Sequence, residues 1–92
     1  MKAILNNEVL ANSDETILIE GNHYFPIESV KTEYLKASDT KTICPWKGLA
    51  SYYNVVINNE IYIDGAWCYP EPKEGAKQIQ DYVAFGKNVI IK

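Results

Sequence analysis

Short runs of apolar and β-branched residues recur along the chain, separated by residues that favour turns. Residues 3–5 and 9–11 flank Asn6-Asn7, and asparagine tolerates the left-handed backbone of a tight turn. These segments predict an opening β-hairpin. Residues 16–20 predict a third strand, which ends at Gly21.

The middle of the chain predicts further strands around one short helical turn. Pro26 disfavours helix at the residue before it and suits the first position of a helical turn through Val30. The clearest hairpin follows later, because residues 53, 55 and 57 share one face of a strand and Asn58-Asn59 forms the turn. The other strands are expected at residues 24–26, 34–37, 40–43, 61–63 and 66–69, with turns at Ser38-Asp39 and Asp64-Gly65.

One helix is expected at about residues 73–82. Pro72 lies at its start, Glu74 opposes the helix dipole in the first turn, and apolar residues recur at helical spacing. Residues 89–91 predict a closing strand. The pattern therefore predicts a mainly β fold, a single domain over residues 1–92 in which a sheet or barrel of short antiparallel strands packs against one helix.

Composition excludes several classes of partner. The 92 residues are 47% hydrophobic and carry a net charge of −3, so no nucleic-acid partner is expected, because neutralising phosphates needs a clustered positive surface. No segment approaches the roughly 18 apolar residues of a membrane span, and the N-terminal segment turns polar too soon for a signal peptide. We expect a cytoplasmic protein without a membrane partner; the sequence does not indicate its oligomeric state.

The two cysteines, Cys44 and Cys68, lie far apart and form no C-x-x-C pair. A zinc site built from local cysteine pairs is therefore absent, and in a reducing compartment both residues are expected to be thiols. No metal site and no cofactor is expected.

Three blocks of residues carry a family resemblance. They are Thr42-Ile-Cys-Pro-Trp-Lys-Gly-Leu-Ala-Ser-Tyr-Tyr53, Ala66-Trp-Cys-Tyr-Pro-Glu-Pro72 and Tyr82-Val-Ala-Phe85, preceded by Tyr24-Phe-Pro26. In this order they resemble the family of domains of unknown function numbered 427, which also carries a nucleotidyltransferase name. The resemblance spans essentially the whole chain.

The resemblance implies a fold more than an activity. It suggests a β-tent-like topology, similar to that of methionine sulfoxide reductase B and several zinc-binding domains, although the two cysteine pairs that hold zinc in such relatives are missing. The chain also departs from the family pattern at Asp81 and Gly86. The nucleotidyltransferase name finds little support, because the acidic residues are scattered and no Gly-rich phosphate loop is present.

The segment Cys44-Pro45-Trp46-Lys47-Gly48 is the densest group of chemically capable residues. Cys44 is the candidate nucleophile if a neighbouring cation such as Lys47 lowers its pKa. The candidate ligand-binding residues, which would form an aromatic pocket around one cation, are Trp46, Lys47, Tyr52, Trp67 and Tyr69.

Each of these residues also has a structural interpretation. Free cysteine is often a buried apolar filler, and Trp67 and Phe85 are also expected as core anchors. Lys47-Gly48 is equally compatible with an exposed turn whose lysine stays in water. His23, the only histidine, is expected in an exposed loop and would act as a base only if the fold brought it to Cys44.

Three functions remain open on the sequence alone. We rank first a binding module for a small molecule or peptide, with its pocket near the Cys-Pro-Trp-Lys-Gly segment. A purely structural or interaction domain ranks second. A cysteine-dependent enzyme, performing redox or acyl-transfer chemistry, ranks third.

Overall fold

The computed structural model describes all 92 residues as antiparallel strands with three short 3-10 helices and no α-helix. No helix is long and apolar enough to cross a membrane. In chain order the elements are β1 (Lys2–Leu5), β2 (Glu8–Asn12), β3 (Ile17–Ile19), β4 (Asn22–Pro26), η1 (Ile27–Ser29), η2 (Thr32–Tyr34), β5 (Leu35–Cys44), β6 (Gly48–Ile57), β7 (Glu60–Cys68), η3 (Glu74–Ile79), β8 (Tyr82–Phe85) and β9 (Ile90–Ile91).

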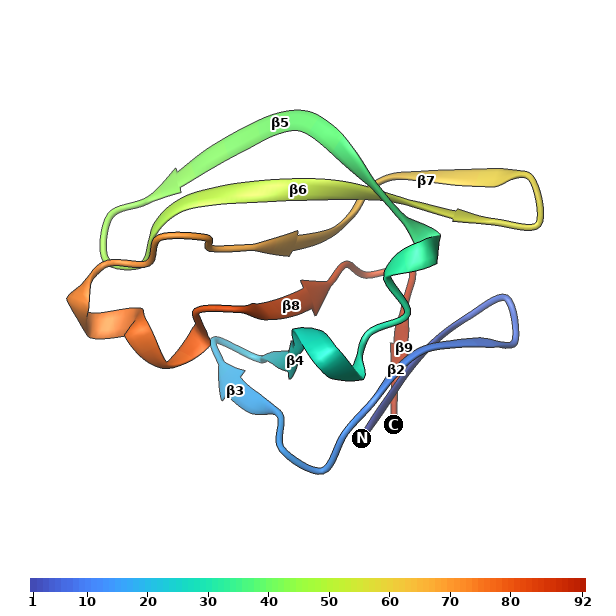
Figure 1. Ribbon diagram of the computed structural model, residues 1–92, viewed down its shortest axis with the longest axis horizontal. Helices are drawn as coiled ribbons and strands as arrows, with labels where there is room; N and C mark the ends of the chain where they lie inside the picture. The colour runs from blue at the N-terminus through green and yellow to red at the C-terminus, as the bar shows by residue number, and fades with distance from the viewer.

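The strands form two sheets (Figure 1). The smaller sheet has the order β2-β1-β9, so that the two ends of the chain lie side by side, and the larger has the order β3-β4-β8-β7-β6-β5. Strands β3 and β5 are open edges of the larger sheet, so the sheet does not close into a barrel. This open arrangement confirms the mainly β prediction and excludes the barrel that the sequence left open.

The main core lies between the two sheets. Strand alternation sends one set of side chains from the larger sheet toward β1 and β2, among them Phe25, Val55, Val83 and Phe85. The Phe25 and Phe85 rings meet edge to face with their centroids 5.7 Å apart. Phe85 is 5% exposed and is therefore a core anchor, as one of the two sequence interpretations held.

The opposite face of the larger sheet carries a second, smaller core. Its buried residues alternate with those of the main core and are covered by η3, which contributes Ala76 and Ile79. The strands in the centre of this sheet are thus buried on both faces, which accounts for their continuous apolar runs. The buried members of this second core are Tyr24, Ala50, Tyr69, Ala76, Ile79 and Ala84.

The hairpins at Asn6-Asn7 and Asn58-Asn59 are confirmed, and all four asparagines adopt positive φ. The turn expected at Ser38-Asp39 is wrong, because β5 continues through it as one strand with an irregular register between Ala37 and Lys41. The Ser38 hydroxyl donates to Asp64 (2.6 Å) and accepts from the Thr40 N–H (3.1 Å), which stabilises a bulge instead of a turn.

The turn expected at Asp64-Gly65 is likewise a bulge inside the continuous strand β7. A Cβ at Gly65 would lie 3.0 Å from the Val55 side chain, closer than most side chains pack, so the close approach favours glycine.

The helix expected at about residues 73–82 is shorter and is a 3-10 helix. It covers Glu74–Ile79, has no side-chain N-cap, and is interrupted at Ala76 (φ −126°, ψ 19°). Gly75 weakens a helix at this point, and Tyr82 pairs with Pro26 in the sheet. The last residue of the expected helix therefore belongs to strand β8 instead.

Candidate functional site

The turn from Cys44 to Gly48, between β5 and β6, is the base of the site. Gly48 has φ +112°, a backbone conformation that side chains rarely adopt. Lys73, just before η3, fixes the turn from outside: its N–H donates to the Lys47 carbonyl (2.9 Å) and its ammonium to the Pro45 carbonyl (2.8 Å). The side chains of this turn are thus placed by a tethered backbone.

Lys47 is the only buried charged residue of the protein, with 5% of its surface exposed. Its ammonium lies 5.0 Å from the centroid of the Trp46 ring and 5.6 Å from that of Tyr69, both within cation–π range. The interpretation of Lys47 as an exposed turn lysine is therefore wrong. The stem is covered by aromatic rings and the charge is held at a defined place.

The counter-ion of Lys47 is Glu20, which forms an ion pair and hydrogen bond with it. Burial opposes the charge on Lys47 and is the largest single influence, but the hydrogen bond to Glu20 and the attraction of the nearby Tyr69, Tyr24 and Cys44 together outweigh it and raise the pKa of Lys47 to about 12. The same bond lowers the pKa of Glu20, with help from the Trp46 indole N–H, which donates at 3.4 Å. Lys47 is therefore charged at every physiological pH.

Glu20 was not among the residues singled out from the sequence. It lies in the two-residue turn between β3 and β4, where Glu20 has φ 53° and Gly21 has φ 81°. Its side chain is 55% exposed. No sequence signal links Glu20 to a lysine 27 positions away, because the contact depends on β3 and the β5–β6 turn meeting in three dimensions.

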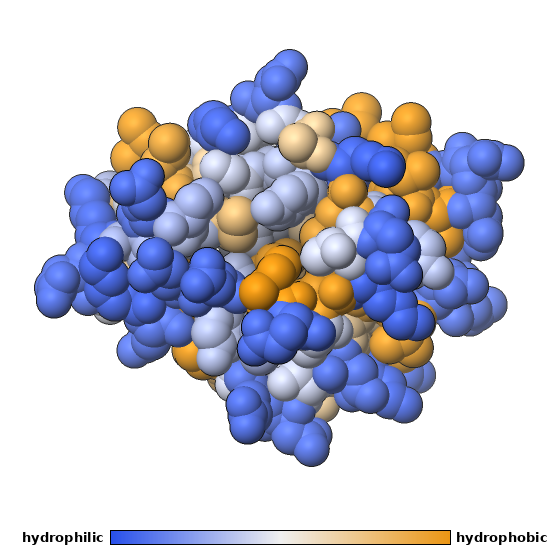
Figure 2. Space-filling model, in the orientation of Figure 1, coloured by the Kyte–Doolittle hydropathy of each residue, from blue (hydrophilic) through white to orange (hydrophobic).

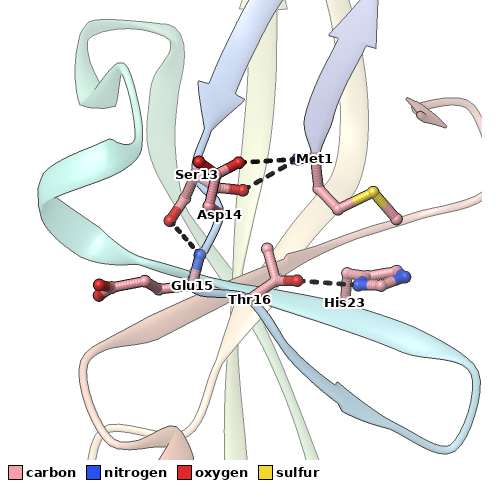
Figure 3. Close-up of polar contacts among 6 residues, drawn as sticks. All are labelled: Met1, Ser13, Asp14, Glu15, Thr16 and His23. Atoms are coloured by element: carbon pink, nitrogen blue, oxygen red, sulfur yellow. Dashed lines mark hydrogen bonds and ion pairs between the residues drawn. The ribbon is translucent and has the colours of Figure 1, made fainter.

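Cys44 is half-buried and packs against the second core. Burial opposes ionisation of its thiol, but the backbone N–H groups of Lys47 and Trp46, together with the Lys47 ammonium, lower its pKa below the usual value. His23 contributes nothing to this environment: its Nδ1 lies 3.0 Å from the Thr16 hydroxyl, near the N-terminal end of the chain (Figure 3). The structure thus offers Cys44 a stabilising cation but no histidine base.

An aromatic wall continues the site across β6 and β7. Tyr52 and Trp67 are cross-strand partners with ring centroids 6.1 Å apart. The Trp67 indole N–H donates to the hydroxyl of the buried Tyr24 (3.3 Å), and the Tyr52 hydroxyl bonds to Thr42 (3.0 Å). Both rings are partly buried against the second core, so Trp67 serves packing as well as the wall.

The structure therefore brings the predicted residues to one face of the larger sheet. Lys47, Trp46 and Tyr69 meet directly, while Tyr52 and Trp67 pair beside them. We call the group Glu20, Cys44, Trp46, Lys47 and Tyr69 the lysine site. Trp46 remains 43% exposed, so the lysine site opens to solvent over its indole ring.

The lysine site contains no cavity, because aromatic rings pack against Lys47. The one hollow of the molecule involves different side chains, including Tyr53, Cys68 and Tyr82, and shares only Tyr69 with the predicted set. The neighbouring side chains Tyr52 and Tyr53 must point to opposite faces of the strand, so the hollow lies on the other face of the sheet. No group of three or more histidine, cysteine or acidic side chains is arranged to hold a metal ion.

Fold and site together define a small, mainly β single-domain protein with a lysine–aromatic cluster on the outer face of its larger sheet. The chain belongs to the family described as domain of unknown function DUF427, named NTP_transf_9, whose model matches residues 1–90. No curated protein matches the chain. The family membership agrees with the resemblance seen in the sequence and assigns no activity.

Proposed function

We propose that this domain is a binding module for small acidic molecules, which bind at the lysine site. The observation that carries the proposal is the burial of the Lys47 ammonium between two aromatic rings, with an exposed carboxylate as its only ionic partner. Burying a charge is costly, and a well-packed apolar residue at such a position is often as stable or more so. A retained buried cation therefore favours recognition of an anion.

In this proposal Glu20 occupies the place that a ligand carboxylate takes. It reaches the site from an exposed two-residue turn, so its side chain is free to rotate into solvent without disturbing a strand. The incoming carboxylate then accepts hydrogen bonds from the Lys47 ammonium and the Trp46 indole N–H, the two donors that Glu20 uses. A flat apolar group on the ligand stacks on the exposed face of Trp46.

The test is a titration with benzoate, followed by ¹⁵N NMR and indole fluorescence. Saturable shifts at the amides of Trp46 and Lys47 are expected. Lys47→Met keeps the apolar stem and removes the charge, so it should abolish these shifts, whereas Lys87→Met, at an exposed turn, should leave them unchanged. Equal binding by Lys47→Met and the unaltered protein would overturn the proposal.

The variant Glu20→Gln shows whether Glu20 competes with the ligand for Lys47 or contacts the ligand itself. If Glu20 stands in for the ligand, its neutral amide competes less well for Lys47 and benzoate should bind more tightly. If Glu20 instead contacts the ligand, the same substitution should weaken binding. A domain with a purely structural role would bind benzoate in neither form.

The lowered pKa of Cys44 supports a second candidate function, a cysteine-dependent acyl transferase. Here the Cys44 thiolate attacks the carbonyl carbon of an acyl thioester, a new thioester forms at Cys44, and the donor thiolate leaves and takes a proton from water. Incubation with an acetyl thioester should then give a mass increase of one acetyl group on Cys44. An unmodified Cys44 after such incubation would exclude this function and leave the binding module.

A further inference from the structure

A hollow of about 170 Å³ lies on the face of the larger sheet that carries the main core. Its walls include the side chains of Ile27, Tyr53 and Val83 and its floor includes Cys68, whereas Tyr82 borders the hollow with its side chain packed against the second core. Tyr53, Ile27 and Cys68 pack against the main core but stay partly exposed, so the hollow lies where that core ends. It is distinct from the lysine site on the opposite face.

The hollow is held open by bonds between its walls. The Ile27 N–H donates to the Asp81 carbonyl (2.9 Å), which joins the start of η1 to the turn before β8. On the other side, the Gln80 amide donates to the Pro70 carbonyl at 3.4 Å. The Cys68 thiol donates to the Tyr53 hydroxyl at 3.7 Å. A ligand therefore meets a largely preformed site and does not have to order it.

One acidic side chain lies at the rim of this hollow. Asp81 has φ 64°, is exposed, and takes part in no ion pair. Burial raises the pKa of the Cys68 thiol, so the floor is neutral at pH 7. The nearby Lys41 donates to the Ser51 hydroxyl (3.2 Å) and lies outside the lining. The lining thus combines aromatic and aliphatic walls with one negative charge.

We propose that this hollow binds a small aromatic ammonium ion. The ring lies between Tyr53 and the aliphatic walls, and the ammonium lies at the rim beside the Asp81 carboxylate, with the Tyr53 ring adding attraction for the cation. The volume sets the size, since drug-sized ligands need roughly 300–1,000 Å³ and this hollow holds about one substituted ring. Figure 2 shows one face of the molecule, on which patches of hydrophobic residues lie among hydrophilic ones.

Benzylammonium is the probe that tests this assignment, with benzoate and benzyl alcohol as matched compounds of the same ring size. The readout is ¹⁵N NMR of the full chain. Benzylammonium should give saturable shifts at the amides of Cys68, Asp81 and Val83, while benzyl alcohol should bind there about three- to five-fold more weakly because it lacks the charge. Benzoate should shift only the amide signals of the lysine site. The experiment can therefore contradict the proposal for the hollow without contradicting the one for the lysine site, and the reverse.

Two variants sharpen the test. Asp81→Asn retains the left-handed turn, since asparagine tolerates positive φ, and should weaken benzylammonium about three- to five-fold. Asp39→Asn, at an exposed position of β5, removes the same charge elsewhere and should have no effect. Ile27→Trp should fill the hollow and abolish the shifts. Absence of saturable shifts at these amides, or equal binding by Asp81→Asn and the unaltered protein, would overturn the assignment.

Discussion

The Lys47 ammonium lies 5.6 Å from the centre of the Tyr69 ring, and the protein raises the pKa of both residues to about 12. For Tyr69 the cause is mainly burial, which disfavours the phenolate. For Lys47 burial acts the other way, and the bond to Glu20 together with the attraction of nearby anionic groups overcomes it. Each shift favours the protonated form in the folded state. The pair is therefore a neutral ring beside a permanent cation at neutral pH.

This relationship predicts a loss of stability at alkaline pH. In the unfolded chain Tyr69 and Lys47 titrate near 10 and 10.5, and in the folded protein near 12. Between these values the unfolded state binds fewer protons, so the free energy of unfolding falls as pH rises, whereas below pH 10 the contribution is fully present. Urea unfolding at pH 8, 10, 11 and 12 measures this fall in the free energy of unfolding.

Tyr69→Phe is the control for the alkaline loss. It retains the ring and removes one titrating group, so the decline in the urea midpoint between pH 10 and 12 should become shallower. At pH 7 the variant should unfold at nearly the same urea concentration as the unaltered protein, because the ring that packs in the second core is retained. An unchanged alkaline slope would assign the loss to Lys47 or to other tyrosines.

Gly48→Ala should destabilise the turn that carries the lysine site. A residue with φ +112° is strained if it has a side chain, and such strain costs about 1–3 kcal/mol. Gly21→Asn, at φ +81° with nothing within 4 Å of the added Cβ, should cost less than about 1 kcal/mol. The urea midpoints of unfolding of the two variants test this difference. A Gly48→Ala midpoint equal to that of the unaltered protein would mean that the turn relaxes to accommodate the side chain.

The two cysteines should differ in thiol reactivity. Labelling with iodoacetamide across pH in Cys68→Ser should give Cys44 a midpoint below its ordinary value, because backbone N–H groups and Lys47 stabilise the thiolate. In Cys44→Ser, burial should place the Cys68 midpoint above it. Adding Lys47→Met to the Cys68→Ser background should raise the Cys44 midpoint. Equal midpoints for the two thiols would contradict the geometry of the turn.

The sequence predicted local features well and long-range contacts poorly. Asparagine pairs marked both tight hairpins, because positive φ is a property of the residue itself. The turns expected at Ser38-Asp39 and Asp64-Gly65 failed, because those two segments bond to each other across the sheet and form bulges. Such a bond depends on register, which no local window contains.

In the candidate site, too, the residues marked by local sequence were predicted and the long-range contacts were missed. The aromatic residues and Lys47 were predicted from their density along the chain, and strand pairing brings them together. Glu20 and the burial of Lys47 were missed, because both arise where the β3–β4 turn meets the β5–β6 turn. The hollow was missed for a similar reason, since it depends on where the smaller sheet stops covering the larger one.

The bond between Trp67 and Tyr24 predicts a measurable coupling. Trp67→Phe retains an aromatic ring but leaves the hydroxyl of Tyr24, which is 1% exposed, without its donor. An unsatisfied buried polar group costs about 1–3 kcal/mol, so this variant should lose roughly that much stability in addition to any packing change. Tyr24→Phe removes the hydroxyl instead, and in the double variant the penalty should disappear. The free energies of unfolding of the four proteins form a double-mutant cycle, and we expect a coupling of about 1 kcal/mol. Additive effects within about 0.3 kcal/mol would show that the bond contributes nothing and that the wall of the site is held by packing alone.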